Sequence, residues 1–186
     1  MKIRPSKAEK EIAFIEKCIV RTMRKFRESP RLFWSEDDVR CYLKQLLLKG
    51  KGSAFRTGRL GNVVLGLPTK NTYAQREDGG LFASADGESE RFALAGWSSA
   101  VPTTWNHVTQ QLSFAIELKH FAATPENWAA QIRNCLLKLS DEKNGVPPAG
   151  RFFLLLTAQR TSQLIRQLNA VFAEFPTVRC YQQVAD

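Results

Sequence analysis

The sequence feature that most constrains the fold is a short apolar run near the C-terminus, residues 152–156 (FFLLL). In a strand, five consecutive apolar residues place apolar side chains on both faces. The run therefore predicts a strand that is covered on both faces. Helical apolar patterns precede it at 126–139 and follow it at 164–172, and 178–184 has the pattern of a further strand. Because helical crossovers join parallel strands, this order predicts neighbouring parallel strands within a sheet.

The N-terminal part of the chain predicts two helices. Ser6 and Glu9 have the spacing of a capping box, and apolar residues then recur at helical spacing until Pro30 ends the pattern. Ser35 is a suitable N-cap for a second helix, which the glycines within 50–52 would end. These two helices precede every predicted strand.

Three strand patterns occupy the middle of the chain, at 62–67, 91–97 and 113–121. The polar, glycine-rich segment 70–90 between the first two predicts a loop or a loose hairpin. We therefore expect an α/β fold in which helices flank a mixed central sheet. Residues 1–186 are expected to form a single domain, because the chain is too short to favour two.

The charge composition favours a polyanionic partner. The chain has 27 Lys and Arg residues against 18 Asp and Glu residues, a formal net charge of +9. Such an excess attracts nucleic acid without identifying it, and a merely basic, solvated surface remains an alternative. No stretch of about 18 apolar residues predicts a membrane span, and no signal-peptide pattern is present. A cytoplasmic location is therefore expected.

The cysteine pattern does not favour a zinc site. Cys18, Cys41, Cys135 and Cys180 are far apart, none belongs to a CxxC pair, and the chain has only two histidines. Zinc sites normally require closely spaced pairs of such ligands. We expect four reduced and buried thiols.

Two charged residues near the end of the third predicted strand are the main candidates for chemistry. Side chains alternate along a strand, so Glu117 and Lys119 share one face while Phe114, Ile116 and Leu118 share the other. A charged pair at the end of a buried strand is costly unless it is hydrated, paired or bound to a metal. The alternative is a surface strand end that carries an ordinary ion pair.

Glu36 is a further acidic candidate, in the first turn of the second predicted helix. It precedes Val39 by three residues and Leu43 by seven, so it lies on the inward face of that helix. An acid in a first turn also favours the helix dipole without any other role. Its orientation nevertheless allows Glu36 to reach a site at the end of the sheet.

With these residues and this order of elements, the chain resembles the PD-(D/E)XK nuclease superfamily over about residues 10–160. That superfamily has the restriction-endonuclease-like fold with an αβββαβ core, and Glu117-Leu118-Lys119 matches its (D/E)xK motif on the third strand. The resemblance implies a metal-dependent DNA endonuclease or phosphodiesterase. It implies Glu36 and Glu117 as ligands of Mg²⁺ or Mn²⁺, Glu117 and Lys119 as catalytic residues, and Lys119 as the group that orients water or stabilises transition-state charge.

The sequence departs from that family at the second strand. The family has an aspartate there as its other main metal ligand, and Ala93 occupies the expected position. A methyl group cannot bind a cation, so the site is either degenerate, altered by substitution, or completed by a nearby acid such as Asp86, Glu88 or Glu90. An intact site is not implied by the motif alone.

Loop residues outside this motif are candidates for contact with nucleic acid, namely Arg56, Arg59, Lys70 and Trp105. The resemblance implies DNA as the partner, and a homodimer or a protein partner remains open. Three functions stay in competition. They are a metal-dependent nuclease impaired by Ala93, a non-catalytic nucleic-acid-binding or partner-binding module of the same fold, and an unrelated α/β domain whose charge keeps it in solution.

Overall fold

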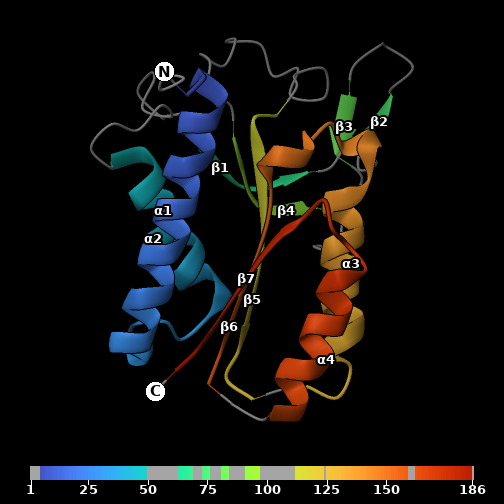
Figure 1. Cartoon of the computed structure of the whole chain (residues 1–186). Helices are drawn as coiled ribbons and strands as arrows, with labels where there is room; N and C mark the ends of the chain where they lie inside the picture. Colours follow the sequence, from blue (N-terminus) through green and yellow to red (C-terminus); the bar gives the residue numbers. More distant parts are fainter. Residues whose placement is uncertain are drawn as a thin grey trace.

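The computed structural model describes residues 5–49, 63–68, 73–75, 81–83, 91–96, 112–123, 125–158 and 162–185. The elements in chain order (Figure 1) are α1 Lys7–Glu28, the 3-10 turn η1 Pro30–Leu32, α2 Glu36–Lys49, β1 Val63–Pro68, β2 Tyr73–Gln75, β3 Leu81–Ala83, β4 Arg91–Gly96, β5 Phe114–Phe121, α3 Trp128–Ser140, the 3-10 turns η5 Glu142–Asn144 and η6 Pro148–Gly150, β6 Arg151–Thr157, α4 Ser162–Ala173 and β7 Arg179–Val184. Within these ranges, no helix has both the length and the apolar character that crossing a membrane requires.

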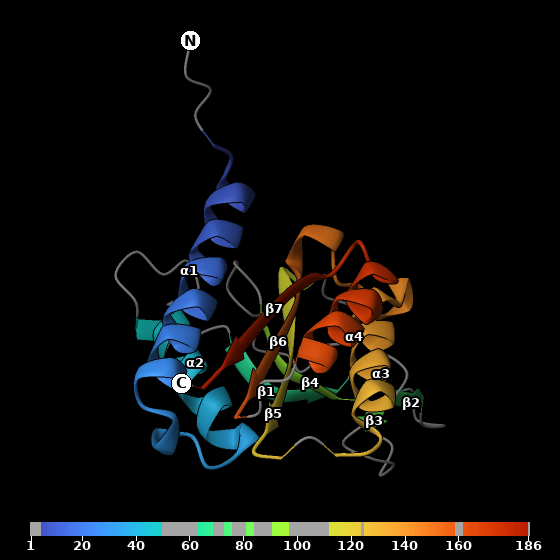
Figure 2. The same cartoon turned by 60° about the horizontal axis from the view of Figure 1, so that its bottom comes forward.

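Five strands form one mixed sheet in the order β1-β4-β5-β6-β7, and β2 pairs with β3 separately. Strands β1, β4 and β5 are antiparallel neighbours, whereas β5, β6 and β7 run parallel. Figures 1 and 2 show α1 and α2 on one face of the sheet and α3 and α4 on the other. The predicted α/β class with a mixed, helix-flanked sheet is therefore confirmed.

Two apolar clusters form the core, one on each face of the sheet, and β6 contributes to both. Phe152, Leu154 and Leu156 belong to the cluster that includes α1 and α2 residues. Phe153 and Leu155 belong to the cluster that includes α3 and α4 residues. All five side chains are buried. The unbroken apolar run of the sequence is thus explained by a central strand with a layer of helices on either side.

The predicted helix starts are confirmed by their capping hydrogen bonds. The Glu9 backbone N–H donates to Ser6 Oγ at 3.2 Å, and the Ser6 N–H donates to Glu9 Oε2 at 2.6 Å. At the second helix, the Asp38 N–H donates to Ser35 Oγ at 3.3 Å while the Asp38 carboxylate accepts from the Ser35 N–H at 2.9 Å. This cap makes Glu36 the first residue of α2 and fixes the direction of its side chain.

The expectation of four buried thiols is wrong for Cys41. All four cysteines are free, and Cys18 and Cys135 are buried, but Cys41 is exposed and Cys180 only partly covered. The buried face of α2 carries Val39, Leu43 and Leu47. Because a position two residues from Val39 points to the opposite side of a helix, Cys41 faces solvent.

Gly150 provides a test of the packing at the start of β6. A Cβ at this position would lie 2.2 Å from the Ser113 carbonyl oxygen and 3.1 Å from Phe114 Cα, both backbone atoms. These backbone atoms lie at and just before the start of β5, so they cannot move away as a flexible side chain could. We therefore expect Gly150→Ala to lower the free energy of unfolding by about 1–3 kcal/mol. Urea denaturation measures this change. The neighbouring exposed Ala149→Ser is the control, expected within about 0.5 kcal/mol of the parent, and equal stability of Gly150→Ala would contradict the prediction.

Candidate functional site

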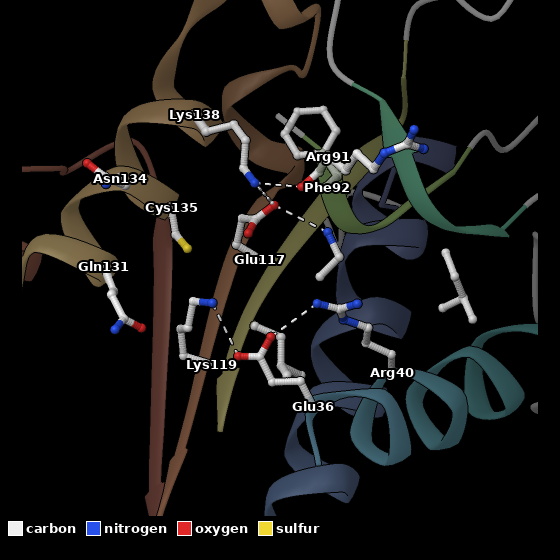
Figure 3. A pocket seen from close by; sticks show the side chains of 13 residues that line it. Glu36, Arg40, Arg91, Phe92, Glu117, Lys119, Gln131, Asn134, Cys135 and Lys138 are labelled. Carbon is white, nitrogen blue, oxygen red and sulfur yellow. Dashed lines mark hydrogen bonds and ion pairs between the residues drawn. The ribbon is translucent and has the colours of Figure 1, made fainter. Parts of the chain in front are cut away.

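A pocket opens where β4 and β5 stop pairing. Their ladder runs from Gly96↔Phe114 to Leu94↔Ile116, although β4 begins earlier at Arg91 and β5 continues to Phe121. A cavity of about 540 Å³ lies at this point, lined by residues from α2, β1, β4, β5 and α3 (Figure 3). The pocket is therefore placed by the point at which two central strands separate.

Glu117 lies on the β5 wall of this pocket and is almost fully buried, with 4% of its surface exposed. Its Oε1 accepts a hydrogen bond from the Ala93 backbone N–H at 3.2 Å and lies 2.9 Å from Lys138 Nζ. Burial raises the pKa of Glu117, while Lys138, a hydrogen bond from Cys135 and the Ala93 N–H act in the opposite direction. The Glu117 carboxylate thus depends on its immediate neighbours to remain charged.

Lys138 approaches from α3 and contacts a second oxygen. Its Nζ donates to the Arg91 carbonyl oxygen at 2.6 Å and lies 6.0 Å from the centroid of the Phe92 ring. Figure 3 shows this side chain reaching from α3 towards Glu117 and the start of β4. The ammonium therefore joins α3, β4 and β5 at one point.

Glu36 and Lys119 form the second polar cluster of the pocket. Glu36 Oε2 lies 3.3 Å from Lys119 Nζ, and Glu36 Oε1 lies 3.1 Å from an Arg40 guanidinium nitrogen. Glu36 Oε2 also accepts from the His120 backbone N–H at 3.4 Å, a long and weak hydrogen bond. These side chains are about one-quarter exposed, so the cluster is accessible from solvent. The predicted inward orientation of Glu36 is confirmed.

Cys135 is the other reactive group near Glu117, but it is not a nucleophile. Burial raises the pKa of its thiol to about 12, with the nearby Glu117 charge acting in the same direction. The thiol is therefore protonated at neutral pH and serves as a hydrogen-bond donor to the carboxylate.

His120 packs on the other face of the sheet from Glu117. Its ring makes a T-shaped contact with Phe26 of α1, with centroids 5.7 Å apart. Burial lowers the pKa of His120, although Glu36 and Asp38 raise it. The predominantly neutral imidazole is thus a packing group at neutral pH.

The structure brings some predicted residues together and leaves others outside its described part. Glu36, Ala93, Glu117 and Lys119 all line this pocket. The candidate nucleic-acid contacts Arg56, Arg59, Lys70 and Trp105, and the alternative acids Asp86, Glu88 and Glu90, lie outside the described residues. The predictions that concern them remain predictions.

Three cationic residues of the pocket, Arg40, Arg91 and Lys138, were not expected from the sequence. Lys138 follows Gln131 by seven residues and Cys135 by three, so the three share one helix face. That spacing was the available signal. The signal is weak because Leu137 and Leu139 flank Lys138. In the sequence, Lys138 therefore looks like an ordinary solvent-facing residue of an amphipathic helix.

The pocket has an excess of positive charge. Two carboxylates, Glu36 and Glu117, and four cationic residues line the pocket, and Asp37 beside it also pairs with Arg40 at 3.0 Å, which leaves an excess of one positive charge over these three acids. The four are Arg40, Arg91, Lys119 and Lys138. Clustered Lys and Arg side chains attract anions, and the planar donors of Arg match the oxygens of a phosphate.

The described residues do not fit a resident divalent cation. Mg²⁺ requires several oxygen ligands and is usually bound by more than one carboxylate or by carboxylates and substrate phosphates. No group of three His, Cys, Asp or Glu side chains within the described ranges could hold a metal ion. Both carboxylates of the pocket already contact cationic groups, and the methyl side chain of Ala93 supplies no ligand.

The fold and the pocket together define an α/β domain with a mixed five-stranded sheet and a cation-rich cavity beside its central strand. Comparisons with protein-family models, curated proteins and solved structures find no match for this chain. The function of the pocket must therefore be inferred from its own geometry and charge.

Removal of the Lys138 charge tests the electrostatics of the pocket. Lys138→Met leaves Glu117 buried without its counter-charge, so we expect a loss of about 3–5 kcal/mol in the free energy of unfolding near pH 8. The substitution also raises the pKa of Glu117 further above 4.5, the value expected without the protein environment. The folded state then binds a proton more readily than the unfolded chain. The free energy of unfolding therefore falls as pH rises from about 4.5 through the raised pKa of Glu117 in the folded state.

We therefore expect a smaller loss near pH 5 than near pH 8, measured by urea denaturation at both pH values. Lys143→Met, at an exposed position, is the matched control and should change stability by less than about 0.5 kcal/mol. A loss for Lys138→Met that equals the control, or that does not depend on pH, would contradict the assigned role of the ion pair.

Proposed function

We propose that this chain is a nucleic-acid-binding domain related in architecture to the PD-(D/E)XK nucleases, whose pocket receives a backbone phosphate rather than Mg²⁺. The observation that carries this proposal is the arrangement of four cationic side chains and two already neutralised carboxylates around one cavity. An anion entering this cavity would meet the charge excess directly.

The order of strands supports the architectural part of the proposal. Strands β1, β4, β5 and β6 are neighbours in that order, with two antiparallel pairs followed by a parallel pair. Two helices precede them and α3 connects β5 to β6. This order is compatible with the αβββαβ core implied by the resemblance, and Glu117 and Lys119 lie on β5, the third strand of the five-stranded sheet in chain order.

The total charge favours nucleic acid over a small anion. A net charge of +9 extends attraction well beyond one pocket, and a polyanion makes many phosphate contacts at once. DNA is the proposed partner, and the cytoplasm the proposed location. A homodimer or an additional protein partner remains compatible with this reading.

Salt-dependent DNA binding tests the phosphate-binding role of Lys119. We expect Lys119→Gln to weaken binding to duplex DNA regardless of sequence and to reduce the magnitude of the slope of log K against log salt by about 1, because one phosphate contact is lost. Fluorescence anisotropy over a series of NaCl concentrations measures the slope. Arg133→Gln removes an equal charge from an exposed residue that pairs with Glu174 away from the pocket, and should leave the slope unchanged.

An equal effect of the two substitutions would show that total charge, rather than the pocket, controls binding. An absence of DNA binding by the parent chain, or binding that salt does not weaken, would instead favour the unrelated α/β domain.

A metal-dependent phosphodiesterase is the second candidate function. It is favoured by one observation, the presence of Glu36, Glu117 and Lys119 around the same cavity. Under our proposal, Mg²⁺ or Mn²⁺ supports no cleavage of plasmid, linear or single-stranded DNA beyond that of Glu117→Gln, because the carboxylates already contact cationic groups. Gel electrophoresis of the products measures cleavage. Metal-dependent cleavage by the parent chain that Glu117→Gln abolishes would establish the second candidate instead.

A further inference from the structure

The Lys138 ammonium is held by the kind of oxygens that bind hard metal ions. One is the carboxylate oxygen Oε1 of Glu117 at 2.9 Å, and the other is the backbone carbonyl oxygen of Arg91 at 2.6 Å. Carboxylate and carbonyl oxygens are the usual protein ligands of Mg²⁺ and Ca²⁺. The lysine side chain is only 12% exposed, so its ammonium is fixed within the protein rather than free in solvent.

We propose that the Lys138 ammonium is a built-in cation that replaces a divalent metal at Glu117, so that the pocket binds phosphate without metal. The statement about metal concerns this chain's own residues, whereas the statement about phosphate rests on the proposed function. The two parts can therefore fail separately.

Charge repulsion is the first argument for replacement. A divalent ion bound to Glu117 Oε1 would lie within a few ångströms of the ammonium that contacts the same oxygen. Repulsion between like charges at this separation is strong in a buried site, where water screens poorly. Metal binding therefore requires Lys138 to leave the carboxylate.

The residue at position 93 provides the second argument. The Ala93 backbone N–H donates to the same Oε1 that Lys138 contacts, so the backbone of residue 93 and the ammonium share this oxygen. Ala93 also lines the pocket. A carboxylate at this position would add an oxygen ligand to the pocket, whereas the methyl group adds none. The single positive charge of Lys138 is balanced by the single carboxylate of Glu117, so no acidic side chain is required at position 93.

Four forms of the full chain test this inference: the parent, Ala93→Asp, Lys138→Met, and the double variant Ala93→Asp/Lys138→Met. Isothermal titration calorimetry with MnCl₂ measures metal affinity, and thermal unfolding with MnCl₂ or EDTA measures metal-linked stability. We expect the double variant to bind Mn²⁺ at least about tenfold more tightly than the parent, because it gains a ligand and loses a repelling charge.

The melting temperature of the double variant should rise by roughly 5–10 °C at saturating Mn²⁺, and EDTA should reverse the rise, because the metal binds only the folded state. The parent should show neither effect. Ala93→Asp alone should bind Mn²⁺ less tightly than the double variant, because the ammonium still contacts Glu117 Oε1 and repels the metal. Equal Mn²⁺ affinity in the parent and the double variant would overturn the inference.

Lys138→Met alone keeps the test decisive if the double variant does not fold. We expect at least about tenfold tighter Mn²⁺ binding by Lys138→Met than by the parent, since the repelling charge is removed while Glu117 remains. Equal affinity of these two proteins would show that the ammonium does not compete with a cation, and would overturn the inference. Parent Mn²⁺ binding that Glu117→Gln abolishes would do the same.

DNA binding by the parent chain tests the statement about phosphate. We expect its affinity to change by less than about twofold between EDTA and Mn²⁺ at matched ionic strength, because the cation at Glu117 is already part of the protein. An affinity that rises tenfold with Mn²⁺ would overturn that statement. If the parent binds no DNA under either condition, the proposed function fails while the calorimetric result still decides the role of Lys138.

Discussion

The buried ion pair between Glu117 and Lys138 is the interaction on which the pocket depends. Between β4 and β5 the backbone ladder ends at Leu94↔Ile116, and the backbone groups beyond it require other partners. Glu117 accepts from the Ala93 N–H, and Lys138 donates to the Arg91 carbonyl oxygen. The two side chains thus replace part of the missing ladder and hold the strands open at a defined separation.

The second carboxylate of the pocket has a similar structural task. Glu36 accepts from the backbone N–H of His120, in the part of β5 beyond its ladder with β4, while its charge is matched by Lys119 and Arg40. A structural requirement is therefore sufficient to explain why acids lie at both positions. These backbone contacts explain the two acids without requiring a bound metal.

The sequence predicted the scaffold of the site better than its chemistry. The run 152–156 predicted a strand covered on both faces because its signal is local. Ser35 predicted the position of Glu36 correctly, because an N-cap residue determines where the helix begins and which residues form its first turn. The partner of Glu117 was not predictable in this way. Lys138 lies 21 positions along the chain, and only the packing of α3 against β5 brings its ammonium to the carboxylate.

Similarly, the end of the ladder at Leu94 has no local signal, because β4 is apolar on both sides of that residue. The sequence therefore indicated three charged residues of the pocket, Glu36, Glu117 and Lys119, without indicating which cations pair with the two acids. That pairing decides whether Glu117 is available as a ligand. It depends on contacts between segments whose relative placement follows from the whole fold.

An ammonium and a divalent ion differ in what they can do to a phosphate. Both neutralise a carboxylate and attract an anion, but a divalent ion also lowers the pKa of a bound water and so generates a nucleophile. The Lys138 ammonium has one charge and donates hydrogen bonds, and it has no open coordination position for water. Under our proposal, a pocket with this cation would hold a phosphate group while lacking the means to activate water against it. Binding without hydrolysis is the chemistry that follows.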